Sequence, residues 1–274
     1  TETEILDIIQ RFATTSAIAK QAGFTGVQIH GAHGYLVSQF LSPNHNKRTD
    51  QWGGTLNNRM RFVREVYKSI RANVGEDFPV SIKLNSADFQ KGGFTEEESI
   101  EVIRTLTDDG MDLIEISGGT YESPVMANVK QSTYDREAYF LKFAETIRQE
   151  KTPAGHNIPL AVTGGFRTTT GMADALALDN LDMIGIARPL VVDPNYPKKI
   201  LAGQAKSNPI QARSTGIKFI DNLGLMEVAW YTRQLHRMGQ GKAPKPNEGT
   251  LGSLVKVLLT SSFKTFKTRR LRAS

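Results

Sequence analysis

The residues best suited to chemistry form a short cluster after an apolar, β-branched segment. His30, His33 and Tyr35 lie within six residues, at the end of the segment 25–31. An imidazole can donate a hydrogen bond to a carbonyl oxygen or an oxyanion, and a phenol can deliver a proton. The spacing of three lets a tight turn direct both imidazoles at one point. The alternatives are a hydrogen-bonded core histidine with a packed tyrosine, and a metal site, for which the nearby sequence offers no third ligand.

A second candidate is a charged residue inside an apolar strand. Lys83 lies in the segment 79–84, where an ammonium group is costly unless it meets an anion or an electron-rich group. Its position predicts a side chain that points into the mouth of a barrel. The alternative is a lysine at the strand end whose ammonium group reaches water.

Two glycine-containing or basic loops follow the last two apolar segments. Gly164 and Gly165 follow one segment, and Ala187 and Arg188 follow the next. Backbone N–H groups in such loops bind phosphate oxygens, and arginine adds a paired hydrogen bond. Consecutive loops of this kind resemble the phosphate site of (β/α) barrels.

The long polar segment 38–62 is rich in turn-forming residues. A connection of this length is usually functional or held by its own hydrogen bonds. We interpret Arg48, Asp50, Arg59 and Arg61 as an internal ion-pair network.

The elements that position these residues alternate between strand and helix. Short apolar segments predict strands at 25–31, 79–84, 111–117, 158–162 and 181–187, and helices are expected at 1–22, 57–73, 95–109, 137–150, 168–179 and 225–239. Thr95 with three following glutamates predicts a helix start.

The alternation of strands and helices predicts a parallel sheet covered by helices, either a (β/α) barrel or an open doubly wound sheet. No GxGxxG motif follows the first strand, which disfavours a dinucleotide-binding fold. The chemistry is expected at the C-terminal ends of the strands.

Taken together, these motifs resemble the old yellow enzyme family of FMN-dependent NAD(P)H oxidoreductases. The strongest match is GFTGVQIHGAHGYLVSQFLSPNHNKRTDQWGGTLNNRMRF at 23–62, and VSIKLNSADF, DLIEISGG, the Gly164–Gly165 loop and MIGIARPLVVDP also match. The resemblance covers residues 1–245. It implies an α/β fold of the (β/α)8 TIM-barrel type, of which this chain would contain strands four to eight.

The resemblance also implies roles for the candidate residues. His30 and His33 would bind the carbonyl of an α,β-unsaturated substrate, and Tyr35 would give a proton to its α-carbon. Lys83 would lie against FMN, while Gly164, Gly165, Ala187 and Arg188 would bind its phosphate. NADH or NADPH would be the reductant. The histidine pair favours the ene-reductase branch, and a chain without cysteine cannot ligate the iron–sulfur cluster of larger relatives through thiolates.

The departure from the family is that its members begin with three more βα-units. We therefore expect a fragment, a truncated product, or a barrel completed by another chain. Five strands would leave two open sheet edges, so we expect the isolated chain to be unstable, to bind FMN weakly, or to self-associate into an oligomer.

Composition places limits on other functions. The 274 residues contain no cysteine, which excludes disulfides and thiolate metal sites. The formal charge of +6 equals the six basic residues of 249–274, a segment without Asp or Glu. We expect domains at 1–245 and 246–274, no nucleic-acid partner, and a cytoplasmic location. The basic amphipathic tail either packs on the barrel with a disordered end, or contacts a membrane surface or partner. The loop 118–136 is expected to cap the site.

The leading hypothesis is an ene-reductase. The alternatives are a non-catalytic barrel remnant that no longer binds flavin productively, and a non-redox phosphate-binding barrel that uses His30 and His33 as acid and base.

Overall fold

The computed structural model describes residues 1–118, 140–150, 152, 154–177, 181–207, 210, 225–257 and 259. These residues form two compact units. The first contains residues 1–166 and 171–185, and the second contains residues 167–170 and 186–274. The expected capping loop from residue 119 onward and the basic end of the tail lie outside the described residues.

The first unit is built on a parallel sheet whose strands follow one another in chain order. Its strands are β1 (Val27–Gly31), β2 (Val80–Asn85), β3 (Leu113–Ser117), β4 (Leu160–Thr163) and β5 (Met183–Gly185), in the order β1-β2-β3-β4-β5. A doubly wound sheet reverses direction at a switch point, whereas a barrel adds each strand beside the last. The observed strand order therefore identifies the fold as the barrel type of α/β fold and not as an open sheet. Within the described residues, β1 and β5 are the edge strands.

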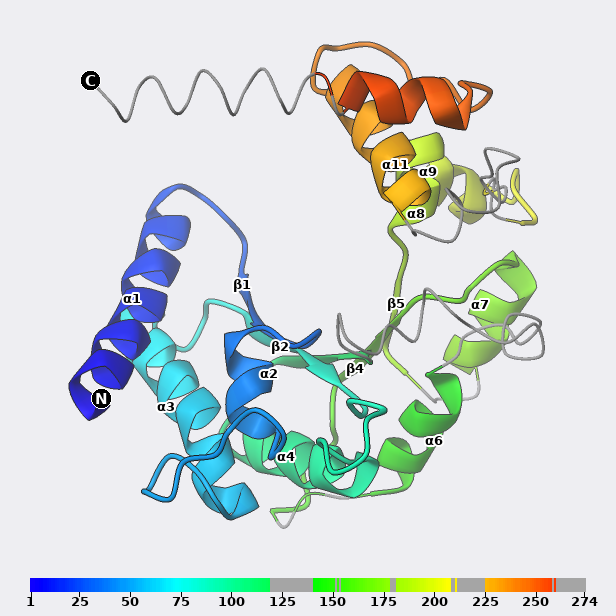
Figure 1. Ribbon diagram of the computed structural model, residues 1–274. Helices are drawn as coiled ribbons and strands as arrows, with labels where there is room; N and C mark the ends of the chain where they lie inside the picture. The colour runs from blue at the N-terminus through cyan, green and yellow to red at the C-terminus, as the bar shows by residue number, and fades with distance from the viewer. Residues whose placement is uncertain are drawn as a thin grey trace, which may run out of the picture. The chain divides into compact units, whose positions relative to one another are not determined.

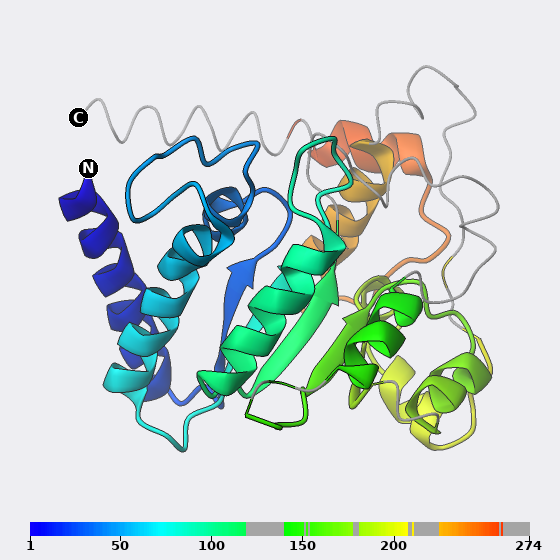
Figure 2. The same cartoon turned by 90° about the horizontal axis from the view of Figure 1, so that it is seen from below.

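Helices cover one side of this sheet (Figures 1 and 2). They include α1 (Glu2–Gln21), α3 (Leu56–Val74), α4 (Glu96–Asp108) and α6 (Leu141–Gln149), while α2 (Leu36–Leu41) follows β1 and α7 (Thr169–Ala177) follows β4. Thr95 caps α4 together with Glu98, as the sequence predicts. The helices thus begin and end close to their expected residues, because capping and periodicity are local signals.

The two faces of the central strands differ in chemistry. Successive side chains of a strand point to opposite faces. Side chains facing the helices are aliphatic and at most 2% exposed: Ile29, Ile82, Leu84, Ile114 and Ile116. The opposite face, here called the inner face, carries His30, Lys83 and Glu115, which are register partners on β1, β2 and β3. The inner face therefore presents a polar row along the sheet.

The second unit is helical in its described part. It contains α8 (Arg188–Val192), α9 (Tyr196–Leu201), α11 (Leu225–Met238) and a helix over 250–257. Trp230 is fully buried, and its indole N–H donates to the Glu248 carbonyl at 2.9 Å. The Glu248 carboxylate accepts hydrogen bonds from Gln234 and Lys256, so the start of the terminal helix is tied to α11. The expected domain boundary at residue 245 stays a prediction.

None of the helices in the described part of the chain combines the length and apolar composition needed to cross a bilayer.

Candidate active site

The turn after β1 brings the three predicted acid–base residues together. The His30 ring centroid lies 5.2 Å from that of His33 and 4.9 Å from that of Tyr35. His33 has a φ of 64°, a left-handed conformation that is uncommon for a residue with a side chain. Gly34, with φ 78°, continues the turn. The backbone thus folds sharply enough for residues three and five positions apart to share one location.

His33 is held by the two strands that follow β1. Its backbone N–H donates to Asn85 Oδ1 at 3.2 Å, and its Nε2 lies 2.8 Å from Ser117 Oγ. Asn85 and Ser117 end β2 and β3 and are 1% and 6% exposed. Because Ser117 occupies Nε2, Nδ1 is the ring nitrogen left for another partner.

Lys83 points to the inner face, as the sequence predicts, and meets a carboxylate there. Its Nζ lies 2.6 Å from Glu115 Oε1, and Gln28 Nε2 donates to Glu115 Oε2 at 2.9 Å. The side chains of Lys83 and Glu115 are only 18% and 15% exposed. The cost of burying the ammonium group is therefore offset by an ion pair rather than by contact with water alone.

This environment sets the charge of the histidines. Burial lowers the pKa of His30 and His33, and the positive charge of Lys83 lowers both further. For Glu115, burial alone would raise the pKa, but hydrogen bonds from Lys83, Thr163 and Gln28 outweigh it and hold the pKa below its usual value. At neutral pH the site thus holds two neutral imidazoles beside a charged pair.

The predicted phosphate loops fall in different units. Gly164 and Gly165 have φ of 106° and 82°, which glycine adopts without strain, and the Gly164 N–H donates to the Gly185 carbonyl at 3.4 Å. Ala187 and Arg188, at the start of α8, belong to the second unit. Because the two loops belong to different units, their shared role in binding phosphate stays a prediction.

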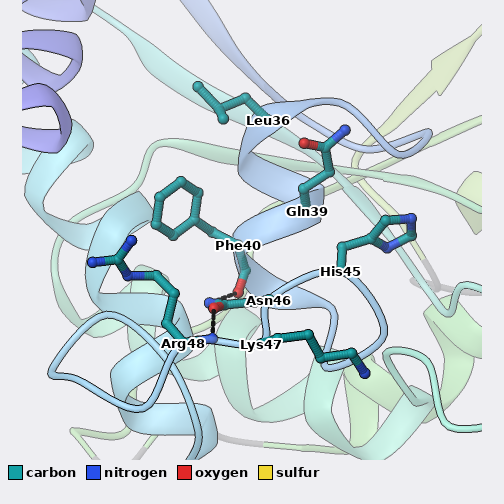
Figure 3. A pocket seen from close by; sticks show the side chains of 7 residues that line it. All are labelled: Leu36, Gln39, Phe40, His45, Asn46, Lys47 and Arg48. Atoms are coloured by element: carbon teal, nitrogen blue, oxygen red, sulfur yellow. Dashed lines mark hydrogen bonds between the residues drawn. The ribbon is translucent and has the colours of Figure 1, made fainter. Parts of the chain in front are cut away.

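The polar segment 38–62 is held by its own hydrogen bonds. The Asn46 amide donates to the Phe40 carbonyl at 2.8 Å, and its oxygen accepts from the Arg48 N–H (Figure 3). The same amide donates to the Trp52 carbonyl at 2.7 Å. The predicted ion-pair network is correct for Arg48 with Asp50. A pocket of about 170 Å³ opens beside this segment, lined by residues between Leu36 and Arg48, none of them a predicted site residue (Figure 3).

The rest of the predicted network has other partners. Arg59 pairs with Glu98 of α4, and Arg61 donates to the Gln51 carbonyl at 2.9 Å. Asp50 therefore pairs with Arg48, whereas Arg59, which is only 4% exposed, pairs with a glutamate outside the segment. Segment 38–62 is therefore held by internal contacts, as predicted, but Arg59 and Arg61 have other partners than the predicted network.

Sequence reasoning missed Glu115, Gln28, Asn85 and Ser117. Glu115 carried a usable signal, since a carboxylate inside the apolar strand 111–117 is as costly as the lysine inside 79–84. Small polar residues at strand ends, by contrast, are too common to stand out. In the described part of the chain, no group of three or more His, Asp or Glu side chains is arranged to hold a metal ion.

Comparison with known proteins identifies the family to which this site belongs. The model of the NADH:flavin oxidoreductase / NADH oxidase family matches residues 1–207. The chain belongs to this family. The match confirms the resemblance to old yellow enzymes, and solved structures of that group, including an old yellow enzyme homologue from Zymomonas mobilis, share the fold.

Relatives within the family span longer chains than this one. An NADH-dependent flavin oxidoreductase of Neonectria sp. is 42% identical over 205 residues, which is 71% of this chain and 26% of that protein. Another, from Talaromyces variabilis, is 37% identical over 254 residues, 86% of this chain and 60% of that protein. The chain thus spans between about a quarter and three-fifths of the length of these relatives.

Two further proteins similar to this chain carry names that specify a substrate. The cinnamate reductase of Clostridium sporogenes is 33% identical over 215 residues, 73% of this chain and 31% of that protein. A structure of 2-naphthoyl-CoA reductase with 2-naphthoyl-CoA is 33% identical and has a TM-score of 0.69, covering 76% of this chain and 31% of that one.

Proposed function

We propose that this chain provides the catalytic half of an FMN-dependent NAD(P)H oxidoreductase that reduces activated alkenes, in particular α,β-unsaturated carbonyl compounds. The observation that carries the proposal is the position of the His33 and Tyr35 rings, whose centroids lie 5.2 and 4.9 Å from that of His30, at the C-terminal end of β1 and beside the Lys83–Glu115 pair. Family membership supports the flavin and the nicotinamide reductant, and the cinnamate reductase supports a conjugated substrate.

The inner face offers donors that fit FMN. The Lys83 ammonium group suits the electron-rich polar edge of the flavin ring, and the Gly164–Gly165 loop leaves its backbone open to close approach. We assign Ala187 and Arg188 to the phosphate by their match to the family motif. FMN, when bound, supplies hydride-transfer chemistry.

The histidines act as neutral hydrogen-bond donors. Their lowered pKa keeps both rings uncharged at neutral pH, and each neutral imidazole retains one N–H. Two such donors directed at a carbonyl oxygen withdraw electron density from the conjugated alkene, which favours attack at its β-carbon. His33, fixed by Asn85 and Ser117, loses little freedom on binding the substrate.

Tyr35 delivers the proton that completes the reduction. Its side chain is 43% exposed, so the hydroxyl can exchange protons with water between turnovers. As a general acid, the phenol transfers its proton to the α-carbon.

Substitution Tyr35→Phe tests this role. We expect the rate of alkene reduction to fall by about 10²–10⁴-fold, the usual contribution of a general acid, while flavin reduction by NADH or NADPH is unchanged. Rapid-mixing absorbance measurements separate the two half-reactions. Tyr67→Phe is the matched control, since it removes a phenol from α3 on the far side of the sheet. An unchanged rate of alkene reduction in Tyr35→Phe contradicts the proposal.

A further inference from the structure

We propose that Glu115 is a positioning residue, which fixes the Lys83 ammonium group on the inner face and balances its charge. The contact itself is independent of the proposed function, and only its consequence for flavin rests on that function. Nothing in the family comparison assigns a role to this glutamate.

Both carboxylate oxygens of Glu115 accept hydrogen bonds, and Thr163 is a further side-chain donor to this carboxylate. One carboxylate oxygen lies 2.6 Å from Lys83 Nζ, and the other accepts from Gln28 at 2.9 Å. Gln28, His30, Lys83 and Glu115 lie on three adjacent strands and face the same side. A carboxylate fixed at both oxygens cannot rotate away, so it defines one location for the ammonium group.

Lysine needs such a partner more than arginine does. Its ammonium group is a point charge on a flexible four-carbon chain, which otherwise extends toward water. Here the side chain is only 18% exposed, although β1 beside it is an edge strand within the described residues. The ion pair therefore keeps Lys83 at the sheet surface, where it can meet a ligand on the inner face.

The same pair sets the net charge beside the histidines. Lys83 lowers the pKa of His30 and His33, and Glu115 acts in the opposite direction on both. Removing the carboxylate charge leaves one uncompensated positive charge beside two imidazoles. An uncompensated ammonium group also favours whichever form of a bound ligand carries more negative charge.

The first experiment needs no flavin. In the full chain, the Lys83 ammonium protons are followed by nitrogen-15 NMR, with the ring resonances of His30 and His33 as a second readout. We expect Glu115→Gln to speed exchange of the ammonium protons with water and to lower the pKa of both histidines. Glu115→Asp, which retains the charge, restores the histidine values in part. Glu101→Gln is the matched control, because it removes an exposed carboxylate from α4.

The second variant guards against a folding defect. Gln28→Ala changes an exposed side chain and leaves the ion pair, but removes one hydrogen-bond donor from the Glu115 carboxylate. We expect the pKa of the Glu115 carboxyl to rise and exchange of the Lys83 protons to quicken. The proposal is overturned if neither Gln28→Ala nor folded Glu115→Gln changes the exchange rate of the Lys83 ammonium protons or the pKa of the two histidines.

The flavin consequence is tested by a double-mutant cycle. With FMN bound to the full chain, Glu115→Gln should raise the reduction potential by about 30 mV, equal to a tenfold change in the oxidised-to-reduced ratio of a two-electron couple. In a Lys83→Met background the same substitution should have no further effect. An equal shift in both backgrounds shows that Glu115 does not act through Lys83. Absence of FMN binding overturns the proposed function and leaves the NMR result to decide the positioning role.

Discussion

The two faces of strands β1 to β3 have opposite chemistry, although their residues alternate along the same few positions. The face toward the helices is aliphatic and dry, with Ile114 and Ile116 fully buried. The inner face carries Lys83 and Glu115 as a charged pair, followed by Ser117 in contact with His33. Stability therefore resides mainly on one face and chemistry on the other, and neighbouring residues of a strand should respond differently to substitution.

The largest expected effect lies on the aliphatic face. Ile114→Ala removes a fully buried side chain from β3, and we expect the free energy of unfolding to fall by about 2–5 kcal/mol. Urea denaturation measures this, with Ile114→Val as the milder control at about 0.5–1.5 kcal/mol. A loss for Ile114→Ala below that of the valine variant contradicts the assignment of stability to this face.

Substituting one buried serine near each face compares the two faces at a finer level. Ser117 Oγ contacts His33, while Ser99 Oγ, fully buried on α4, donates to the Asn85 carbonyl at 2.8 Å. Alanine at either position should cost about 1 kcal/mol of unfolding free energy. Only Ser117→Ala should shift the His33 ring nitrogen resonances. If Ser99→Ala shifts them equally, the two faces are not independent.

The smallest effect is the pH dependence of stability. Because the pKa of His30 and His33 is lower in the folded than in the unfolded chain, the unfolded state binds more protons between the folded values and about 6.5. The free energy of unfolding should therefore rise with pH across that window. His33→Gln should make this rise with pH less steep. Urea denaturation at several pH values measures this dependence. A free energy of unfolding that falls with pH across the window contradicts the lowered pKa of the two histidines.

Much of the fold follows from sequence because its signals are local. The five strands and the Thr95 cap depend on nearby residues, and the structure confirms them within a few positions. The choice between barrel and open sheet depends on which strands pair, and no local sequence pattern specifies that pairing. The observed order of the strands in the sheet distinguishes the two folds.

The candidate site was predictable in part for the same reason. His30, His33 and Tyr35 form one turn, so their spacing alone indicates that they meet. Glu115 and Lys83 are 32 residues apart and pair only because β2 and β3 align in that register. Ser117 likewise reaches His33 across 84 residues of sequence. These contacts depend on tertiary structure, and the sequence contained no signal for them beyond the cost of a buried charge.

The most direct test of the account is anaerobic spectroscopy of the full chain with FMN. We expect saturable FMN binding, loss of the visible flavin absorbance on adding NADH or NADPH, and its return on adding one equivalent of a simple enone. Flavin that binds and is reduced but is not reoxidised by any α,β-unsaturated carbonyl compound would contradict the assignment of His30, His33 and Tyr35 to alkene reduction.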